Sequence, residues 1–114
     1  MPILVNYLEK RGVHVYGTNG APFFRGKRNG FNQIYLPEHP TALQVKHELS
    51  HWLDFKKLGF DKYAQLSTYQ REKMVLERLR NNRIWEDLNQ FEKEFSLNYI
   101  EQFKSGHNPG VKYE

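Results

Sequence analysis

The run His47-Glu48-Leu49-Ser50-His51 places two histidines four positions apart, with a glutamate beside the first. On an α-helix, positions four apart lie on one face, so both imidazoles can point at a single metal ion. A neutral imidazole is a good zinc ligand, and a carboxylate next to the metal-bound water can remove its proton. Zinc lowers the pKa of that water and polarises a substrate carbonyl. The run therefore predicts a zinc (Zn2+) site for peptide-bond hydrolysis, with His47 and His51 as ligands and Glu48 as general base.

A catalytic zinc site needs a third protein ligand and keeps one coordination position open for water. Because the chain has no cysteine, that ligand must be a histidine or a carboxylate. The extended motif with a third histidine shortly after His51 is absent, and His107, in a glycine-rich tail, is one remaining candidate. Glu72 and Glu77 are two others, because both fall on the next expected helix.

A helical wheel separates these two glutamates. At about 100° per residue, Glu72 falls among the apolar side chains of its helix, whereas Glu77 falls about 140° away. A carboxylate on an apolar helix face is costly unless it is paired or bound to metal. The wheel therefore predicts Glu72 as the third ligand and leaves Glu77 exposed or in a supporting position. The alternative for Glu72 is an ion pair with a base such as Arg71 or Lys73.

Four further side chains are candidates for supporting roles. Asp54 lies three residues after His51 on the same side of the helix, where it could accept a hydrogen bond from a ligand imidazole. Tyr63, Tyr69 and His39 lie near the ends of the elements around the expected site and could stabilise an oxyanion. The sequence does not choose among them, and each has a purely structural role as its alternative.

The element that must position the motif is a helix with clear start and stop signals. Thr41 followed three residues later by Gln44 is a capping box. Apolar residues then continue at helical spacing to about Leu58, and Gly59 follows as a stop. The pattern predicts one helix from Thr41 to Leu58 that carries both histidines.

The remaining segments predict a small sheet and further helices. The alternating segment Phe31 to Leu36, closed by prolines, predicts an edge strand beside the active-site helix. A substrate backbone would pair with that strand. Other expected elements are a helix over 2–10, strands over 13–16 and 23–24, and two later helices over 68–81 and 85–103. Strands followed by segregated helices indicate an α+β fold.

The length of 114 residues fits a single domain spanning 1–114. No apolar stretch approaches the roughly 20 residues that a membrane-spanning helix requires. The N-terminus lacks a basic segment followed by an apolar one, so no secretory signal is visible. The net charge of +4 arises from 17 basic residues spread among 13 acids, which argues against a nucleic-acid-binding surface.

Two segments resemble the zincin-like metallopeptidase toxin domains of bacterial polymorphic toxins: His47-Glu48-Leu49-Ser50-His51-Trp52-Leu53-Asp54-Phe55-Lys56-Lys57-Leu58-Gly59 and Tyr69-Gln70-Arg71-Glu72-Lys73-Met74-Val75-Leu76-Glu77-Arg78-Leu79. The resemblance covers the chain from about Phe31 onward. It implies a minimal gluzincin-like fold, with His47, His51 and Glu72 as zinc ligands and Glu48 as base. It also implies delivery at the C-terminal end of a longer secreted protein, a protein or peptide substrate, and a cognate immunity protein.

Two alternative functions are compatible with the sequence. The first is a regulatory metallopeptidase with the same site and no toxic role, whose gene would lack a neighbouring export module and immunity gene. The second is a binding module that uses its basic surface and carries no working metal site. Metal analysis of protein purified without a histidine tag distinguishes the second from the first.

Overall fold

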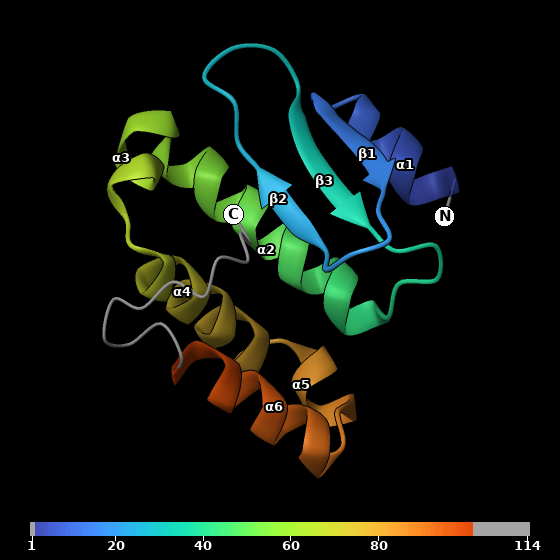
Figure 1. Cartoon of the computed structure of the whole chain (residues 1–114), viewed down its shortest axis with the longest axis vertical. Coiled ribbons are helices and arrows are strands. Elements are labelled where there is room, and N and C mark those ends of the chain that lie inside the picture. Colours follow the sequence, from blue (N-terminus) through green and yellow to red (C-terminus); the bar gives the residue numbers. More distant parts are fainter. Residues whose placement is uncertain (1, 102–114) are drawn as a thin grey trace.

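The computed structural model describes residues 2–101, and of the first three residues it describes no side chains. Within this range the elements are α1 (Pro2–Glu9), β1 (Val13–Gly17), β2 (Phe23–Arg25), β3 (Asn32–Leu36), α2 (Ala42–Leu58), α3 (Phe60–Gln65), α4 (Thr68–Arg80), α5 (Arg83–Asp87) and α6 (Gln90–Glu101). A three-stranded sheet is followed by a set of helices (Figure 1). The predicted α+β fold is confirmed. His107, one of the ligand candidates, lies outside the described residues.

The strand order in the sheet is β1-β3-β2. β3 pairs in parallel with β1 and antiparallel with β2, so that Ile34 has Val15 on one side and Phe24 on the other. The prediction that the 31–36 segment is an edge strand is therefore wrong. After β1 the chain forms β2 at the opposite edge of the sheet, and β3 then lies between these two strands. The alternation of apolar and polar residues in a strand does not indicate which strands it pairs with. The strand at the edge nearer α2 is the short β2.

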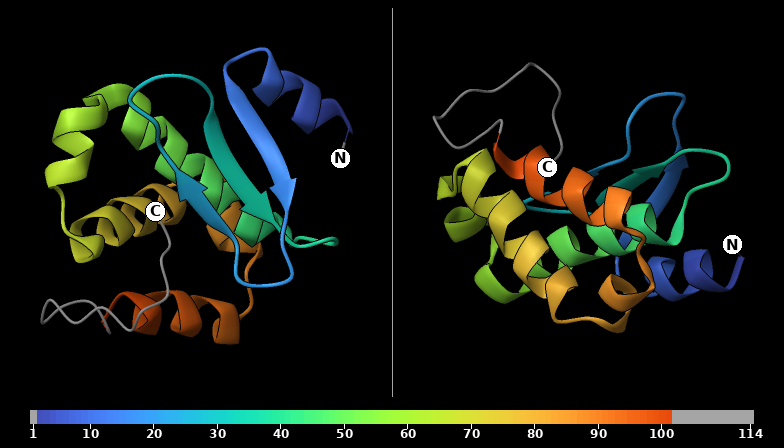
Figure 2. Two further views of the ribbon diagram at one scale, coloured as in Figure 1. Left: turned by 45° about the horizontal axis from the view of Figure 1, so that its top comes forward. Right: turned by 90° about the horizontal axis from the view of Figure 1, so that it is seen from below.

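Helix α2 begins at the predicted capping box. The Thr41 hydroxyl accepts a hydrogen bond from the Gln44 amide, and the Gln44 side chain accepts one from the Thr41 amide. The helix ends at Gly59, whose φ of 83° is a backbone conformation that L side chains rarely adopt. Figures 1 and 2 show α2 lying across one face of the sheet. Apolar side chains from the sheet, α1, α2 and α3 form one buried core there: Leu8, Val13, Phe24, Ile34, Leu36, Trp52, Phe55 and Tyr63.

Helix α4 packs against α2 and is capped in the same way. The Ser67 hydroxyl accepts from the Gln70 amide, and the Gln70 side chain accepts from the Ser67 amide. An ion pair between Arg78 on α4 and the buried Asp54 on α2 fastens the two helices together. The predicted helix over 68–81 is thus observed in nearly the predicted bounds, and its buried face contacts the helix that carries the motif.

The C-terminal helical region differs from the prediction of one long helix over 85–103, whose last two residues lie outside the described range. The structure breaks it into α5 and α6, with Asn89 as the start signal of the second helix. The Asn89 side chain accepts from the Glu92 amide while the Glu92 carboxylate accepts from the Asn89 amide, which satisfies the first turn of α6. Helix α6 then lies beside α4 (Figure 2). Helix α3 was not predicted, because it has only six residues and its N-cap, Gly59, provides no side-chain hydrogen bond.

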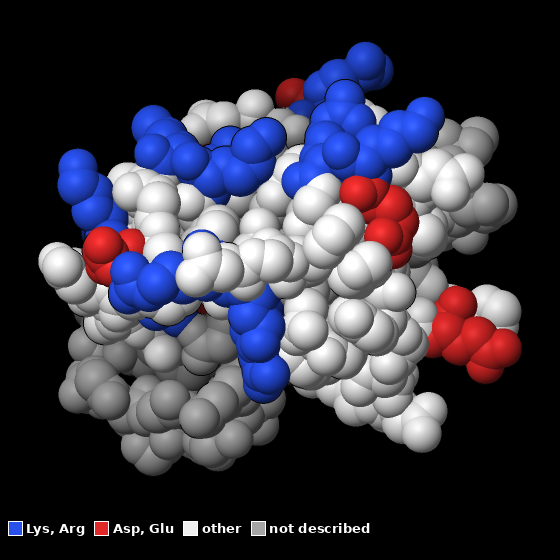
Figure 3. All heavy atoms as spheres, turned by 90° about the horizontal axis from the view of Figure 1, so that it is seen from above, with Lys and Arg blue, Asp and Glu red and all other residues white. Residues whose placement is uncertain are grey.

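Lysine and arginine side chains gather on the face seen from above in Figure 3, with few acids among them. Among the exposed charges of the described residues, Asp61 forms a 2.8 Å ion pair with Arg28. Basic and acidic residues are interspersed along the sequence, but basic side chains predominate on this face of the folded chain. No helix of the described range is long and apolar enough to cross a membrane.

Candidate metal centre

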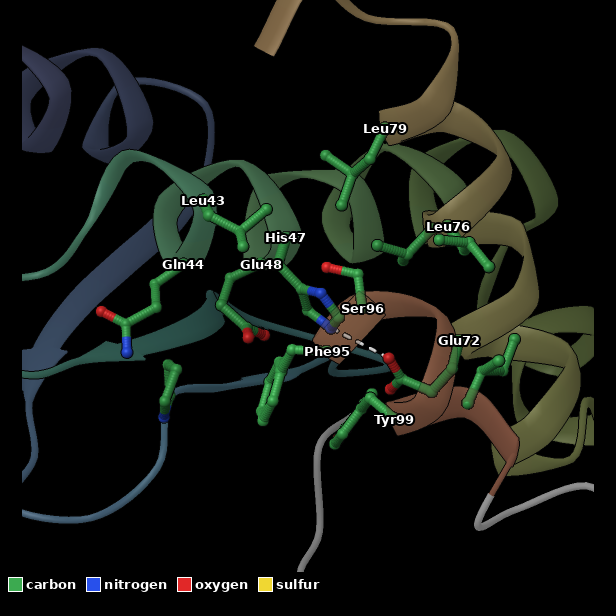
Figure 4. A pocket seen from close by; sticks show the side chains of 13 residues that line it. Leu43, Gln44, His47, Glu48, Glu72, Leu76, Leu79, Phe95, Ser96 and Tyr99 are labelled. Carbon is green, nitrogen blue, oxygen red and sulfur yellow. Dashed lines mark ion pairs between the residues drawn. The ribbon is translucent and has the colours of Figure 1, made fainter. Parts of the chain in front are cut away.

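Three side chains from α2 and α4 converge on one point. The Nε2 atom of His47 lies 2.9 Å from Oε1 of Glu72, and the Nε2 atom of His51 lies 3.1 Å from Oε2 of the same carboxylate. The potential ligand atoms of all three residues lie within 4.8 Å of one another. Figure 4 shows the His47 imidazole directed from α2 toward the Glu72 carboxylate on α4. Helical spacing brings the two histidines together, and the packing of α4 on α2 brings the glutamate to them.

The converging atoms are buried and do not satisfy one another by hydrogen bonding. The His47 and His51 Nε2 atoms and both Glu72 oxygens have no hydrogen bond of acceptable geometry within the described residues, although the N–O distances are short. Buried polar atoms of this kind are costly without a partner. Two imidazole nitrogens and a carboxylate are also the donor set of a catalytic zinc site with an open position. The residues therefore fit a metal ion at this point.

The predicted inward orientation of Glu72 is observed, since only 2% of this residue is exposed. Burial alone would raise its pKa, but the charges of His51 and His47 and their close contacts with its oxygens outweigh burial and lower the pKa to about 2. For His47, burial would lower the pKa, but contact with Glu72 and the charge of Glu48 raise it above its ordinary value. The raised pKa means that Glu72 favours a proton on His47 when no metal ion is bound.

Glu48 lies next to this triad and has a different environment. It is 1% exposed, and neither carboxylate oxygen has a hydrogen bond within the described residues. Burial raises its pKa to about 7, although the nearby His47 and His51 charges act in the opposite direction. A general base works best when its pKa is near the operating pH. The two glutamates of the centre therefore have opposite pKa shifts, which suits one to bind a cation and the other to exchange a proton.

The side chain that supports a histidine is Tyr63. Its hydroxyl lies 3.2 Å from Nδ1 of His51, on the side of the ring away from Glu72. If His51 Nε2 binds a metal, Nδ1 carries the proton and donates to the Tyr63 oxygen, which fixes the ring orientation. Arg71 holds Tyr63 in turn, donating to its carbonyl oxygen at 3.1 Å and stacking over its ring. Asp54, a sequence candidate for this support, pairs with Arg78 instead.

The other sequence candidates lie away from the triad. Glu77 is exposed on α4, as the wheel predicted. Tyr69 is half-buried, and the Lys73 ammonium group lies over its ring at 6.0 Å from the ring centre. His39 is almost fully exposed and has Glu38 as its neighbour at 4.0 Å. None of these three side chains lines the pocket beside the metal centre.

A pocket opens beside the triad and Glu48, with a cavity volume of about 190 Å³. Its walls come from the segment before β2 and from α2, α4 and α6: Pro22, Leu43, Gln44, His47, Glu48, Glu72, Val75, Leu76, Leu79, Phe95, Ser96, Tyr99 and Ile100. Figure 4 shows Phe95, Ser96 and Tyr99 reaching into this space from α6. Sequence reasoning missed these α6 residues. The row Phe91, Phe95 and Tyr99, with rings four positions apart, was the signal available for them.

The family model for metallopeptidase toxin 4 matches residues 8–106, which is most of the chain. The chain belongs to this family. The expected resemblance to metallopeptidase toxin domains is thereby confirmed, and the family name indicates a peptidase that uses a metal ion and acts on protein. Neither a search of curated proteins nor a search of solved structures found a match. In this metallopeptidase toxin domain, the cluster of His47, His51 and Glu72 is a set of side chains able to hold the metal.

Proposed function

We propose that this domain is a zinc-dependent, gluzincin-like peptidase in which His47, His51 and Glu72 hold the ion and Glu48 is the general base. The observation that carries the proposal is the convergence of buried ligand atoms that lack hydrogen bonds, next to a buried carboxylate whose pKa is about 7. A bound zinc ion would polarise the substrate carbonyl and make the attacking water more acidic. Glu48 would take a proton from that water and deliver it to the leaving nitrogen.

Tyr99 is the residue that we assign to donate a hydrogen bond to the developing oxyanion. It lies on the pocket wall, and its ring centre is 6.1 Å from that of His47. Tyr63 and Tyr69, the tyrosines considered from the sequence, do not line the pocket. A preorganised donor at the carbonyl oxygen acts mainly on the transition state.

The substrate backbone cannot pair with β3 as first expected, because β3 has a neighbour on each side. The edge strand β2 is the alternative, since Pro22, the residue before it, lines the pocket. Among the described strands, β2 has no partner on the side away from β3. A peptide added there would extend the sheet and pass the metal centre.

The test begins with tag-free protein that is loaded with zinc and analysed for metal content. We expect about one ion per chain, and cleavage of a protein substrate that stops when the metal is chelated. Absence of metal after loading would exclude the proposal. If instead the basic face of Figure 3 carries the function, chelation and Glu48→Gln should both leave the effect of the protein unchanged.

We further propose that the domain is the toxic C-terminal part of a polymorphic toxin, delivered into a target cell and neutralised by a cognate immunity protein. The family membership supports a toxin. Production of the domain inside bacterial cells should arrest growth, and the Glu48→Gln variant should not. A regulatory peptidase would show metal-dependent cleavage without arresting growth, so the two readouts together separate the two roles.

A further inference from the structure

Helix α6 carries a row of stacked rings that its own packing does not require. Phe91 and Phe95 have ring centres 6.5 Å apart, and Phe95 and Tyr99 have ring centres 6.4 Å apart. We call these three residues the aromatic ladder. Phe91 is 73% exposed and Phe95 is 60% exposed, whereas Ile100 is the buried residue of this helix. Large exposed apolar groups arranged together mark a binding surface more often than a fold requirement.

The inner end of the ladder is at the metal centre. The rings of Tyr99 and His47 form an edge-to-face contact with an interplanar angle of 80°. Phe95 and Tyr99 both line the pocket that contains Glu48 (Figure 4). The rest of the pocket wall is largely apolar, with contributions from α2, α4 and α6: Leu43, Val75, Leu76, Leu79 and Ile100. A cavity of about 150 Å³ lined by apolar side chains accepts benzene. The volume of about 190 Å³ here is thus sufficient for one large apolar side chain.

The spacing of the ladder matches that of an extended peptide. In a strand, side chains on the same face are two residues apart, which at about 3.3–3.4 Å per residue is roughly 6.6–6.8 Å. The ring spacings of 6.5 and 6.4 Å are close to this repeat. A peptide that places one side chain in the pocket can therefore place the second side chain along against the outer rings.

We propose that the aromatic ladder selects the substrate. The pocket, whose wall includes Phe95, takes a large apolar side chain next to the cleaved bond, and Phe95 and Phe91 also contact a second apolar side chain two residues away. The substrates are accordingly extended segments in which apolar residues alternate. This inference rests on the proposed function, because it places the cleaved bond at the metal centre.

Binding of small hydroxamates tests the pocket without requiring catalysis. Acetohydroxamate, N-acetyl-alanine hydroxamate and N-acetyl-phenylalanine hydroxamate share one metal-binding group, and their affinities for the zinc-loaded full chain are measured by calorimetry. Burial of a phenyl ring predicts that the phenylalanine compound binds at least about tenfold more tightly than the alanine compound. If no hydroxamate binds, the proposed metal centre itself is wrong. If all three bind equally, the metal centre stands and the inference is overturned.

Variants of α6 assign the preference to the ladder. Phe95→Ala should reduce the phenylalanine-to-alanine affinity ratio several-fold and leave acetohydroxamate binding unchanged, and Phe95→Leu should keep part of the ratio. Leu97→Ala is the matched control, because Leu97 is also an exposed apolar residue of α6 but does not line the pocket. Equal effects of Phe95→Ala and Leu97→Ala would overturn the assignment. Phe95 is 60% exposed and Leu97 is 38% exposed, so these variants should fold.

Peptide cleavage tests the outer ring. Phe91→Ala should raise the KM several-fold for a peptide with phenylalanine two residues from the pocket residue, and should not change the KM for the same peptide with serine there. A change in sedimentation behaviour of Phe91→Ala, with no change in either KM, would identify the ladder as a contact between copies of the chain. That result would overturn its role in substrate selection.

Discussion

Substituting the two glutamates of α4 separately gives the sharpest test of the metal centre. Glu72 is 2% exposed and faces both histidines, whereas Glu77 is exposed on the same helix. Glu72→Gln keeps the shape of the side chain but removes the charge of the only carboxylate in the cluster. Glu77→Gln makes the same chemical change five residues away and serves as the matched control.

The expected magnitudes differ by well over an order of magnitude. Loss of a side chain that merely supports a ligand lowers metal affinity about 10- to 100-fold. Loss of the charge on a ligand itself should therefore weaken zinc binding by about 100-fold or more, which is roughly 2.7 kcal/mol. Glu77→Gln should stay within about threefold, as expected for an exposed charge.

The assay is a competition titration of each variant against a chromophoric zinc indicator, at fixed pH and ionic strength. Circular dichroism of the metal-free variants establishes that each is folded. If Glu77→Gln loses the metal and Glu72→Gln keeps it, the orientation of α4 described above is refuted. If both variants keep it, the third ligand lies elsewhere, and His107 is the next residue to substitute.

Four further predictions follow from the same centre. Glu48→Gln should retain zinc by elemental analysis but lose at least about 100-fold in hydrolysis rate, the usual contribution of a general base; an active variant would remove Glu48 from that role. Tyr63→Phe should weaken zinc binding about tenfold in the indicator titration, because His51 Nδ1 loses its partner, and unchanged affinity would contradict this. Tyr99→Phe should lower kcat about tenfold or more with unchanged zinc affinity, and an unchanged kcat would argue against the assignment. Raising the pH from 5 to 8 should increase the zinc-induced rise in Tm, since zinc must displace the proton of His47, whose folded pKa is raised; a rise that is constant with pH would count against this ligand.

The sign of that pH dependence follows from the metal-free protein. Because the folded pKa of His47 is above 6.5, its contact with Glu72 stabilises the fold fully below pH 6.5 and progressively less as the pH rises through the folded value. Because the folded pKa of Glu72 is about 2, its contribution to the free energy of unfolding is fully present above about pH 4.5 and is lost as the pH falls toward 2. Without zinc, the contact between His47 and Glu72 therefore stabilises the fold most between about pH 4.5 and pH 6.5.

Local sequence signals predicted the two helices of the metal centre well. The Thr41 and Ser67 ends of α2 and α4 are both capping boxes, and these interactions span only three residues. The wheel placed Glu72 correctly because α4 buries one continuous face against α2. Helix register and the choice of the inward glutamate were thus readable from neighbours in the sequence.

Features that depend on distant contacts were not readable. The pairing of β3 with both β1 and β2 involves segments that alternate equally well as edge or central strands. The meeting of Tyr63 with His51 depends on the turn into α3, and the approach of Tyr99 to His47 depends on how α6 returns across α4. Asp54 lay on the predicted side of α2, but the sequence did not reveal that Arg78 would reach it.

The division of the candidate ligands between two helices also has a consequence for the chain as a polymer. A metal ion that joins His51 to Glu72 closes a loop of about 20 residues, and in the chain-entropy model a permanent cross-link over a loop of 15 residues contributes about 3 kcal/mol by restricting the unfolded ensemble. The ion would thus act as a reversible cross-link between segments that are otherwise held by the packing of α4 on α2 and the Arg78–Asp54 pair. A chain that is unfolded loses this constraint together with its site, and regains both on refolding.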